Sequence, residues 1–336
     1  MEKYFETEAT EVAERINHYK QEGCFVFSVF SDMHTHRQTE HGEWCMIHTL
    51  ETMKEVHRNC DIDGLFFLGD AFMTDYNIYP PEYWTLERVN ETFKYLNENM
   101  KEANRNSFYI AGNHDGINAG YPEHKHFYEH CVKNNVPDCK ISKVENKGYY
   151  YLDFPEKNVR CICLVSCYNE NGTNYAEYSK DQILWLCNDA LNVKEDTNIF
   201  LFMHFPPVCS YPESYSLELC KLTDAYKQRK NYENGGKLFD FRNAKGKICA
   251  AFVGDGHYDW ISKNGFACPV VEIAASSLHQ PKFKQSGWWM PEGATSPKRC
   301  FSSRTEVLWD TVVFNPVDND MVIIRFGAGT DRYCKI

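Results

Sequence analysis

The residues of this chain that could bind metals or catalyse a reaction follow directly after apolar segments. Between Gly64 and Gly69 four consecutive large apolar residues occur, and a single carboxylate, Asp70, follows. Such a run predicts a strand buried on both faces, with Asp70 at its carboxyl end. Four other apolar segments end in polar groups of the same kind, which are Asp32 with His34, Asn113 with His114 and Asp115, His204, and Asp255 with His257. Ligands bind outside the carboxyl ends of strands in open α/β sheets, so these five ends could meet at one site.

These strand-end residues offer oxygen and imidazole donors, and no thiolate is among them. Such a mixed set suits manganese, iron, nickel or zinc ions and differs from a thiolate zinc site. The seven candidate ligands are Asp32, His34, Asp70, Asn113, His204, Asp255 and His257. A single ion commonly takes fewer ligands from a protein, whereas two ions that share a bridging carboxylate would use all seven. Two ions ~3.5–4 Å apart are a recurrent device for hydrolysing phosphate esters.

The order of these motifs resembles that of the calcineurin-like metallophosphoesterase superfamily. Its motifs run D-x-H, G-D, G-N-H-D/E, H and G-H-x-H. The corresponding segments here are Asp32-Met33-His34, Gly69-Asp70, Gly112-Asn113-His114-Asp115, His204 and Gly254-Asp255-Gly256-His257. The resemblance covers residues 24–260, and its specificity lies in the combination because each short motif alone is weak. The segment 325–332 is also similar to the tail of some bacterial members.

The resemblance implies an α/β fold, a four-layer αββα sandwich of two mixed β-sheets flanked by helices, with a dinuclear metal site at the strand ends. It also implies hydrolysis of phosphoric esters by attack of a metal-bridging hydroxide. One ion would be held by Asp32, His34, Asp70 and His257, and the other by Asp70, Asn113, His204 and the first histidine of G-H-x-H. That histidine is replaced by Asp255 in this chain. Because an aspartate can still ligate through oxygen, Asp255 is retained as a predicted ligand.

The resemblance places His114 outside the ligand set. His114 would stabilise the transition state or protonate the leaving oxygen, with Asp115 orienting its ring. At Asp255 a carboxylate replaces a neutral imidazole, which shifts the metal preference toward harder ions. We therefore expect two divalent ions, manganese or iron, with zinc and nickel as alternatives. The extra carboxylate should also raise the pKa of the bridging water and give hydrolysis an alkaline optimum.

Alternatives stay open for the residues and for the function. Asp and Asn favour turns after strands in general, and a lone histidine such as His204 is often a core residue. Some superfamily members serve as non-catalytic scaffolds or binding proteins with a degraded metal site, and Asp255 keeps that alternative open here. The motifs do not separate phosphomonoesters from phosphodiesters.

Other polar residues near the motifs have less specific assignments. His36 could lie in a surface loop or behind the ligands. Asp75 and Asp259 are expected as loop polar groups, although Asp259 could brace His257. The remaining candidates are a cluster expected on a solvated face, His124, His126 and His130, and two residues that could rim the pocket, Tyr168 and Asn169.

Composition limits the class of protein. The net charge of -11 argues against a non-specific nucleic-acid binder and against a protein of anionic membranes. The charged N-terminal segment lacks a signal-peptide core, and no apolar run reaches the ~20 residues of a membrane span. The fifteen cysteines are scattered without a Cys-x-x-Cys pair, which predicts free thiols in a reducing compartment. We therefore expect a cytoplasmic protein with a small phosphorylated substrate, and its oligomeric state is left open.

Periodicity and turn residues predict the elements that must position these side chains. Helices are expected at 6–22, 44–60, 86–100 and 179–191, and strands at 24–31, 64–68, 108–110, 148–152, 159–165, 199–203, 250–253, 270–274, 307–314 and 321–326. Alternating strands and helices in the first half imply parallel strands. Residues 208–236 form a polar insertion without assigned structure. One domain over 1–336 is expected, with a motif core at 24–260 and residues 261–336 completing the second sheet.

Overall fold

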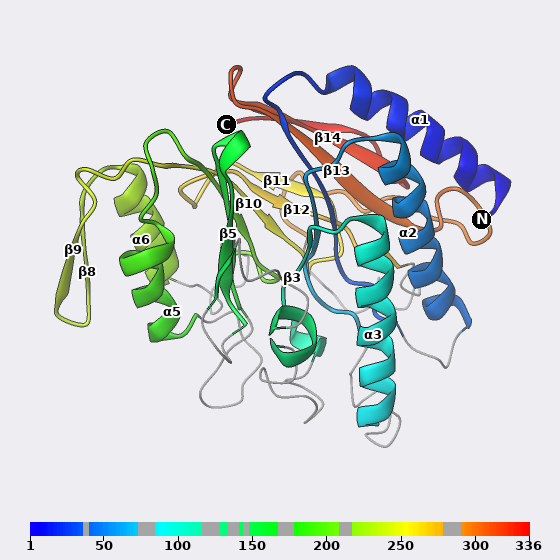
Figure 1. The fold of residues 1–336 in the computed structure, drawn as a ribbon, viewed down its shortest axis with the longest axis horizontal. Helices are drawn as coiled ribbons and strands as arrows, with labels where there is room; N and C mark the ends of the chain where they lie inside the picture. The colour runs from blue at the N-terminus through cyan, green and yellow to red at the C-terminus, as the bar shows by residue number, and fades with distance from the viewer. Residues whose placement is uncertain are drawn as a thin grey trace.

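Two β-sheets pack face to face, and helices cover their outer sides (Figure 1). The structure is a computed structural model that describes residues 1–35, 40–72, 85–115, 128–133, 141–143, 148–166, 178–207, 217–277 and 290–336. On one side lie α1 (Lys3–Tyr19), α2 (Glu40–Asn59) and α3 (Leu86–Ala103), and on the other α5 (Lys180–Trp185) and α6 (Leu217–Lys227). The predicted four-layer αββα sandwich is confirmed.

The six-stranded sheet contains the first three motif strands. Its members are β1 (Phe25–Phe30), β2 (Gly64–Phe67), β3 (Ser107–Tyr109), β13 (Leu308–Asn315), β14 (Asp320–Gly327) and β15 (Arg332–Lys335). The strand order is β15-β14-β13-β1-β2-β3. Strands β1, β2 and β3 run parallel, and β13 pairs antiparallel with the other edge of β1. The residues after β1, β2 and β3 therefore emerge at the same edge.

The seven-stranded sheet carries the remaining motif strands. Its members are β4 (Ile141–Lys143), β5 (Tyr150–Phe154), β6 (Val159–Cys163), β7 (Asn198–Phe202), β10 (Lys247–Val253), β11 (Trp260–Ser262) and β12 (Val270–Glu272). The order is β11-β12-β10-β7-β6-β5-β4, and β12, β10, β7 and β6 are parallel. A separate hairpin is made by β8 (Asn231–Asn234) and β9 (Lys237–Asp240).

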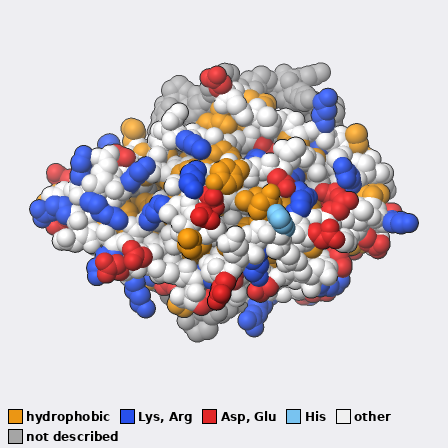
Figure 2. Space-filling view, turned by 90° about the horizontal axis from the view of Figure 1, so that it is seen from above, with side chains coloured by type: hydrophobic (Ala, Val, Ile, Leu, Met, Phe, Trp, Pro, Cys, Tyr) orange, Lys and Arg blue, Asp and Glu red, His pale blue; other side chains and the backbone are white. Residues whose placement is uncertain are grey.

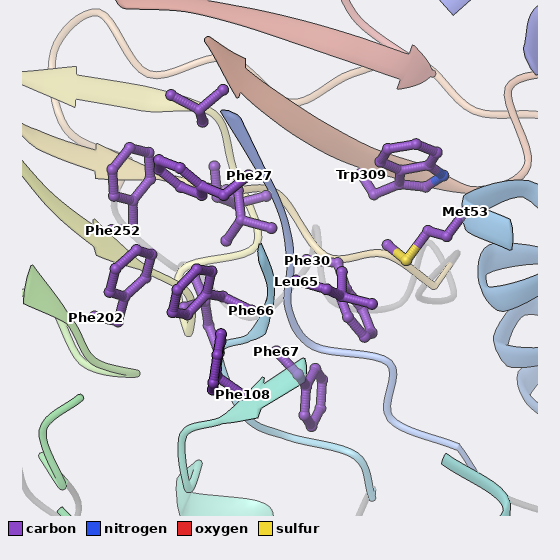
Figure 3. Close-up of a cluster of buried hydrophobic side chains, with 14 of the residues drawn as sticks. Phe27, Phe30, Met53, Leu65, Phe66, Phe67, Phe108, Phe202, Phe252 and Trp309 are labelled. Atoms are coloured by element: carbon purple, nitrogen blue, oxygen red, sulfur yellow. The ribbon is translucent and has the colours of Figure 1, made fainter. Parts of the chain in front are cut away.

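Aromatic side chains fill the space between the sheets (Figure 3). Phe66 of β2 stacks on Phe202 of β7 with ring centroids 3.9 Å apart. Phe27 of β1 meets Phe252 of β10 edge-on at 5.1 Å. All four rings are fully buried. Because burying such a side chain stabilises a fold by about 1.5–3 kcal/mol, this layer holds the motif strands of the two sheets firmly against each other.

Helix α3 illustrates why the helix predictions succeed. Its buried residues Val89, Phe93, Leu96 and Met100 recur every three or four positions and face one side. The helix begins after Thr85, whose side-chain oxygen accepts a hydrogen bond from the backbone N–H of Arg88 at 3.3 Å. The expected boundaries of the other predicted helices hold to within a few residues, except that the segment after α5 continues as a π-helical turn to Ala190.

The sequence leaves the structure of residues 208–236 unassigned, and α6 and β8 lie within this range. One expectation about the second half of the chain is wrong. Residues 261–336 complete the second sheet only through β11 and β12, whereas β13, β14 and β15 join the six-stranded sheet. Periodicity reports burial of a strand but not the identity of its neighbour, so it could not place β13 beside β1.

Some residues singled out in the sequence lie outside the described residues. They are His36, Asp75, His124, His126, Tyr168 and Asn169, and the side chain of His130 is likewise not described. On the face that Figure 2 shows, Lys and Arg side chains lie between Asp and Glu side chains and do not gather into one basic region. Within the described ranges, no helix combines the length and the apolar character needed to cross a membrane.

Candidate metal centre

Tight turns at the strand ends direct the predicted ligands toward one another. Five of these residues have a backbone φ in the left-handed region: 55° at Asp32, 42° at His34, 60° at Asp70, 71° at Asp255 and 59° at His257. Residues other than glycine adopt this region infrequently, and Asp and His are among those that tolerate it best. Such conformations cluster at active sites and ligand clamps, because the surrounding structure must hold them in place.

Two glycines let the ends of β2 and β3 approach closely. A Cβ atom at Gly112 would lie 2.1 Å from Asp70 Oδ1, and one at Gly69 would lie 2.4 Å from the backbone nitrogen of Gly112. Either contact is far below a van der Waals separation, so only glycine fits at these positions. The G-D and G-N-H-D motifs therefore have a steric reason, which is to bring Asp70 beside the turn that carries Asn113.

The first group of predicted ligands contains two imidazoles. His34 Nε2 lies 3.0 Å from His257 Nε2, although the two residues follow strands of different sheets. Asp32 Oδ1 lies 3.2 Å from His257 Nε2 and 3.5 Å from His34 Nε2. Asp70 Oδ2 is 3.6 Å from His34 Nε2. We call Asp32, His34 and His257, together with Asp70, the imidazole-rich half of the centre.

The second group converges on one imidazole nitrogen. His204 Nε2 lies 3.0 Å from Asn113 Oδ1, 3.3 Å from Asp70 Oδ2 and 3.8 Å from Asp255 Oδ1. We call Asn113, His204 and Asp255, again with Asp70, the oxygen-rich half. Asp70 Oδ2 thus faces both halves. The structure brings all seven predicted ligands together, Asp255 included, and their role as metal ligands stays a prediction.

The orientation of the histidines fits metal ions. His34 Nδ1 lies 3.0 Å from the carbonyl oxygen of Phe72, and His204 Nδ1 lies 2.8 Å from that of Leu68. A carbonyl oxygen only accepts, so both rings carry a proton on Nδ1 and turn Nε2 toward the cluster, as metal-binding histidines do. Atoms bound to one ion at ~2.1 Å lie about 3.0–3.5 Å apart, which resembles the spacing within each half. A cation suits this place because Nε2 of His34, His204 and His257 each lies 3.2–3.5 Å from a carboxylate oxygen.

Burial and mutual repulsion act strongly on the carboxyl groups of the cluster. Burial raises the pKa of Asp255 to about 7, with His204 opposing the shift and the carboxylates of Asp32 and Asp70 adding to it. Burial also works against ionisation of Asp70, but His204 and His114 together lower its pKa to about 2. Asp70 is therefore charged at neutral pH, and a divalent ion beside Asp255 would favour its ionised form as well.

His114 lies beside both halves. Its backbone N–H donates a hydrogen bond to Asp70 Oδ1 at 2.8 Å, and its ring centroid is 5.1 Å from that of His34. His34, Asp70 and His114 also present potential ligand atoms within 4.8 Å of one another, as do the trios Asp32–His34–His257 and Asp32–Asp70–His204. Burial lowers the pKa of His114 to about 4, so the ring is neutral at pH 7.

Asp115 has a structural role that the sequence did not indicate. Its carboxylate accepts hydrogen bonds from the backbone N–H groups of Asp70, Ala71 and Gly112 at 2.7–2.9 Å. These bonds tie the end of β2 to the turn after β3 and thereby fix Asp70. The expected contact of Asp115 with the His114 ring is a prediction that these bonds do not test.

Three further residues, Asp259, Arg325 and Arg299, support the cluster from behind. Asp259 lies in the loop between β10 and β11, as expected, but it is buried and binds the guanidinium of Arg325. Arg299 donates to the backbone carbonyls of Ser276 and Ser277 at 2.6 and 2.7 Å, and the N–H of Ser276 bonds to the carbonyl of Ser31 at 2.8 Å. Arg325 begins the segment 325–332 noted in the sequence, but no local signal links it to Asp259, which lies 66 positions away.

Comparison with known proteins identifies the family of this chain. A family model for the calcineurin-like phosphoesterases matches residues 25–232, which is more than half of the chain. The chain therefore belongs to the calcineurin-like phosphoesterase family. The matched range includes five of the seven predicted ligands, whereas Asp255 and His257 lie beyond it.

Two solved structures align with this chain at low sequence identity. A dimetal phosphatase from Danio rerio aligns with a TM-score of 0.57 and 10% identity, over 93% of this chain and 98% of that one. A 5'-nucleotidase from Candida albicans aligns with a TM-score of 0.41 and 13% identity, over 75% of this chain and 45% of that one. No curated protein matches this chain significantly.

Proposed function

We propose that this protein is a phosphoesterase with a dinuclear metal centre that hydrolyses phosphomonoesters or phosphodiesters. One observation carries the proposal: donor atoms from five strand ends of two sheets converge in two adjacent groups that share Asp70 Oδ2. Membership in the calcineurin-like phosphoesterase family supports it. We expect a small phosphorylated substrate and a cytoplasmic location.

Each half would hold one divalent ion. The imidazole-rich half offers two nitrogen and two oxygen ligands, and the oxygen-rich half offers one nitrogen and three oxygen ligands. We expect manganese or iron, with zinc and nickel as alternatives, because oxygen ligands favour harder ions. When bound, the two ions would supply a water of lowered pKa and would neutralise the phosphoryl oxygens.

The chain's own residues would orient the reaction. Asp70 is held by the backbone N–H of His114, and Asp115 in turn fixes the backbone of Asp70. The His114 ring lies against His34, so it would reach a substrate bound between the halves and would stabilise the transition state or assist the leaving oxygen. Asp115 would keep the turn that carries His114 in place.

One observation favours a non-catalytic member of the family, namely the aspartate that replaces the usual histidine at position 255. The contacts of that aspartate argue against degradation of the site. Asp255 Oδ1 lies 3.8 Å from His204 Nε2, and its backbone N–H donates to Asp32 Oδ2 at 3.2 Å. The carboxylate thus stands where it can replace the imidazole as a ligand, so catalysis is the better supported function.

Metal analysis followed by a hydrolysis assay tests the proposal. The purified protein should take up two manganese ions per chain and then hydrolyse either p-nitrophenyl phosphate, a monoester, or bis(p-nitrophenyl) phosphate, a diester. The exposed Asp240→Ala, on the β9 hairpin, is the matched control and should retain both properties. One bound ion or none, without hydrolysis of either ester, would support the scaffold function, in which the metal site is degraded. Two bound ions without hydrolysis of either ester would contradict the proposed catalysis.

A further inference from the structure

The loop between β10 and β11 brings two predicted ligands from the seven-stranded sheet. It carries Asp255 and His257, both with left-handed backbone, and it ends at Asp259. At its start the N–H of Gly254 bonds to the carbonyl of His204 at 2.9 Å. At its end Asp259 and Thr295 exchange two backbone hydrogen bonds of 2.8 and 2.9 Å. The backbone of the loop is therefore fastened on both sides of the two ligands.

The side chain of Asp259 is anchored to the other sheet. Asp259 Oδ1 and Oδ2 accept from Arg325 Nη2 and Nη1 at 2.6 and 3.0 Å, a bidentate pair between a carboxylate and a guanidinium. Arg325 belongs to β14 and is 1% exposed. The backbone N–H of Ala274 also donates to Asp259 Oδ1, at 3.3 Å. The residue two positions after His257 is thus held by a group from the six-stranded sheet.

The guanidinium of Arg325 is itself held rigidly. Its Nε and Nη2 donate to Asp310 of β13 at 2.7 and 3.1 Å, and its Nη1 donates to the carbonyl of Ala328 at 2.7 Å. With the two bonds to Asp259, five hydrogen bonds match the five N–H donors of an arginine. A Cβ atom at Gly329 would lie 2.7 Å from Arg325 Nη1, so the chain also closes over the group. Arg325 has little freedom to move away from Asp259.

A second arginine balances the charges. Arg332 Nη1 lies 3.2 Å from Asp259 Oδ1 and donates to the carbonyl of Glu272 at 3.0 Å, while its Nη2 binds Asp310. Two buried aspartates and two arginines therefore form one neutral cluster behind the loop. Buried ion pairs contribute little to stability compared with apolar side chains of similar volume, because their desolvation is costly. What such a cluster provides is a defined geometry between the groups that it joins.

We propose that Arg325 is a positioning residue for the metal centre, which fixes the loop that carries Asp255 and His257 by holding Asp259. The inference rests on the proposed function, in that both residues are taken as metal ligands. It adds Arg325, which lies outside the range matched by the family model, to the residues on which the proposed function depends. Both halves of the centre depend on this contact, because Asp255 serves the oxygen-rich half and His257 the imidazole-rich half.

Arg325→Lys tests the proposal, because it keeps the positive charge and removes the bidentate geometry. Arg160→Lys is the matched control. Arg160 is 8% exposed and makes a bidentate pair with Asp153 at 2.6 and 2.8 Å, near the start of β6 and so at the opposite end of the sheet from the centre. The measurements are Mn²⁺ titration by calorimetry, electron paramagnetic resonance of the bound manganese pair, and thermal unfolding without metal.

Arg325→Lys should weaken Mn²⁺ binding about 10–100-fold and alter the resonance of the coupled pair, the usual scale for residues that orient ligands. Arg160→Lys should bind Mn²⁺ like the unmodified protein, even if both variants unfold at a lower temperature. If Arg325→Lys does not fold, Asp259→Asn, which keeps the shape but loses the charge, should show the same weakening. Unchanged Mn²⁺ affinity in the folded variant, or equal losses in the Arg325 and Arg160 variants, would overturn the positioning role alone. An unmodified protein that binds no manganese would instead overturn the proposed function.

Discussion

The two halves of the candidate metal centre share Asp70 but differ in their ligands. The imidazole-rich half pairs two histidine nitrogens, 3.0 Å apart, with two carboxylates. In the oxygen-rich half one histidine nitrogen faces an amide oxygen and two carboxylates. The difference comes from a single position, because a histidine at 255 would have made the ligand sets nearly alike.

This difference teaches that the two ions need not be equivalent. Nitrogen ligands suit iron, zinc and nickel, whereas oxygen ligands favour harder ions such as manganese. The oxygen-rich half also carries more negative charge near its ion, which lowers the acidity of a coordinated water. If both halves bind ions as proposed, one substitution would change the properties of one ion while the shared carboxylate would keep the pair together.

Removing the shared ligand should have the largest effect, because it abolishes the distinction between the halves. Asp70→Ala should reduce the manganese content from two ions per chain to none and should abolish hydrolysis, since Asp70 Oδ2 faces both His34 and His204. The measurement is the manganese content of the dialysed variant, compared with that of the control variant Asp240→Ala. Full occupancy in the Asp70 variant would show that the centre is assigned wrongly.

His114 belongs to neither half, and its removal should affect rate without affecting occupancy. His114→Ala should lower turnover roughly 10²–10⁴-fold, the scale of a positioned acid–base group. Because the backbone N–H of residue 114 still holds Asp70, both ions should remain bound. Turnover and metal content are measured on the same preparation. Loss of one ion would place the His114 ring among the ligands.

Asp255→His should make the halves alike. With an imidazole in place of the carboxylate, the preference for zinc over manganese should rise about tenfold, and the acidic limb of the pH–rate profile should move to lower pH. Competition titrations and profiles at saturating manganese compare this variant with the unmodified protein. If the acidic limb of the pH–rate profile lies at the same pH in both proteins while both are fully metallated, Asp255 does not contact the ion.

The smallest effect concerns the metal-free protein. Burial raises the pKa of Asp255 from 3.8 to about 7, so the folded state binds a proton that the unfolded state releases between these pH values. The contribution of Asp255 to the free energy of unfolding is fully present below pH ~4 and is lost as the pH rises through about 7. The unfolding free energy therefore falls by at most about 1.4 kcal/mol per pH unit in this range.

Asp255→Asn should therefore flatten the decline in unfolding free energy between pH 4 and 7, measured by urea denaturation in the presence of a chelator. Asp240→Asn, on the exposed β9 hairpin, should not change the slope in this range, because the Arg242 guanidinium holds the pKa of Asp240 below its usual value. Equal slopes for the unmodified protein and Asp255→Asn would mean that Asp255 is ionised in the metal-free cluster.

Much of the site could be predicted because its signals are local. An apolar run that stops at an aspartate or a histidine reveals both the strand and the group at its end, and β1, β2, β7 and β10 were found in this way. The left-handed backbone at those ends was not predicted, although Asp and His tolerate it. The order of five motifs then supplied the set of predicted ligands, whose side chains lie together in the structure.

The contacts that hold the site from behind could not be predicted, because they join residues that are far apart in the sequence. Asp259 meets Arg325 across 66 positions of sequence, and both residues carry ordinary surface-type side chains. Strand β13 has a clear apolar pattern, yet that pattern is equally compatible with either sheet. Only packing decides these cases, since burial and charge pairing are properties of the assembled core.

The pairing of β1 with β13 has a consequence for biosynthesis. Phe25 stands opposite Phe314, so one edge of β1 gains its partner only when the last strands have left the ribosome. At typical translation rates this happens roughly 10–50 s after β2 is made. During that delay an open, aromatic strand edge is a template for association between nascent chains. We expect newly made chains to need chaperones during this interval, and metal capture to wait until β13 has paired with β1.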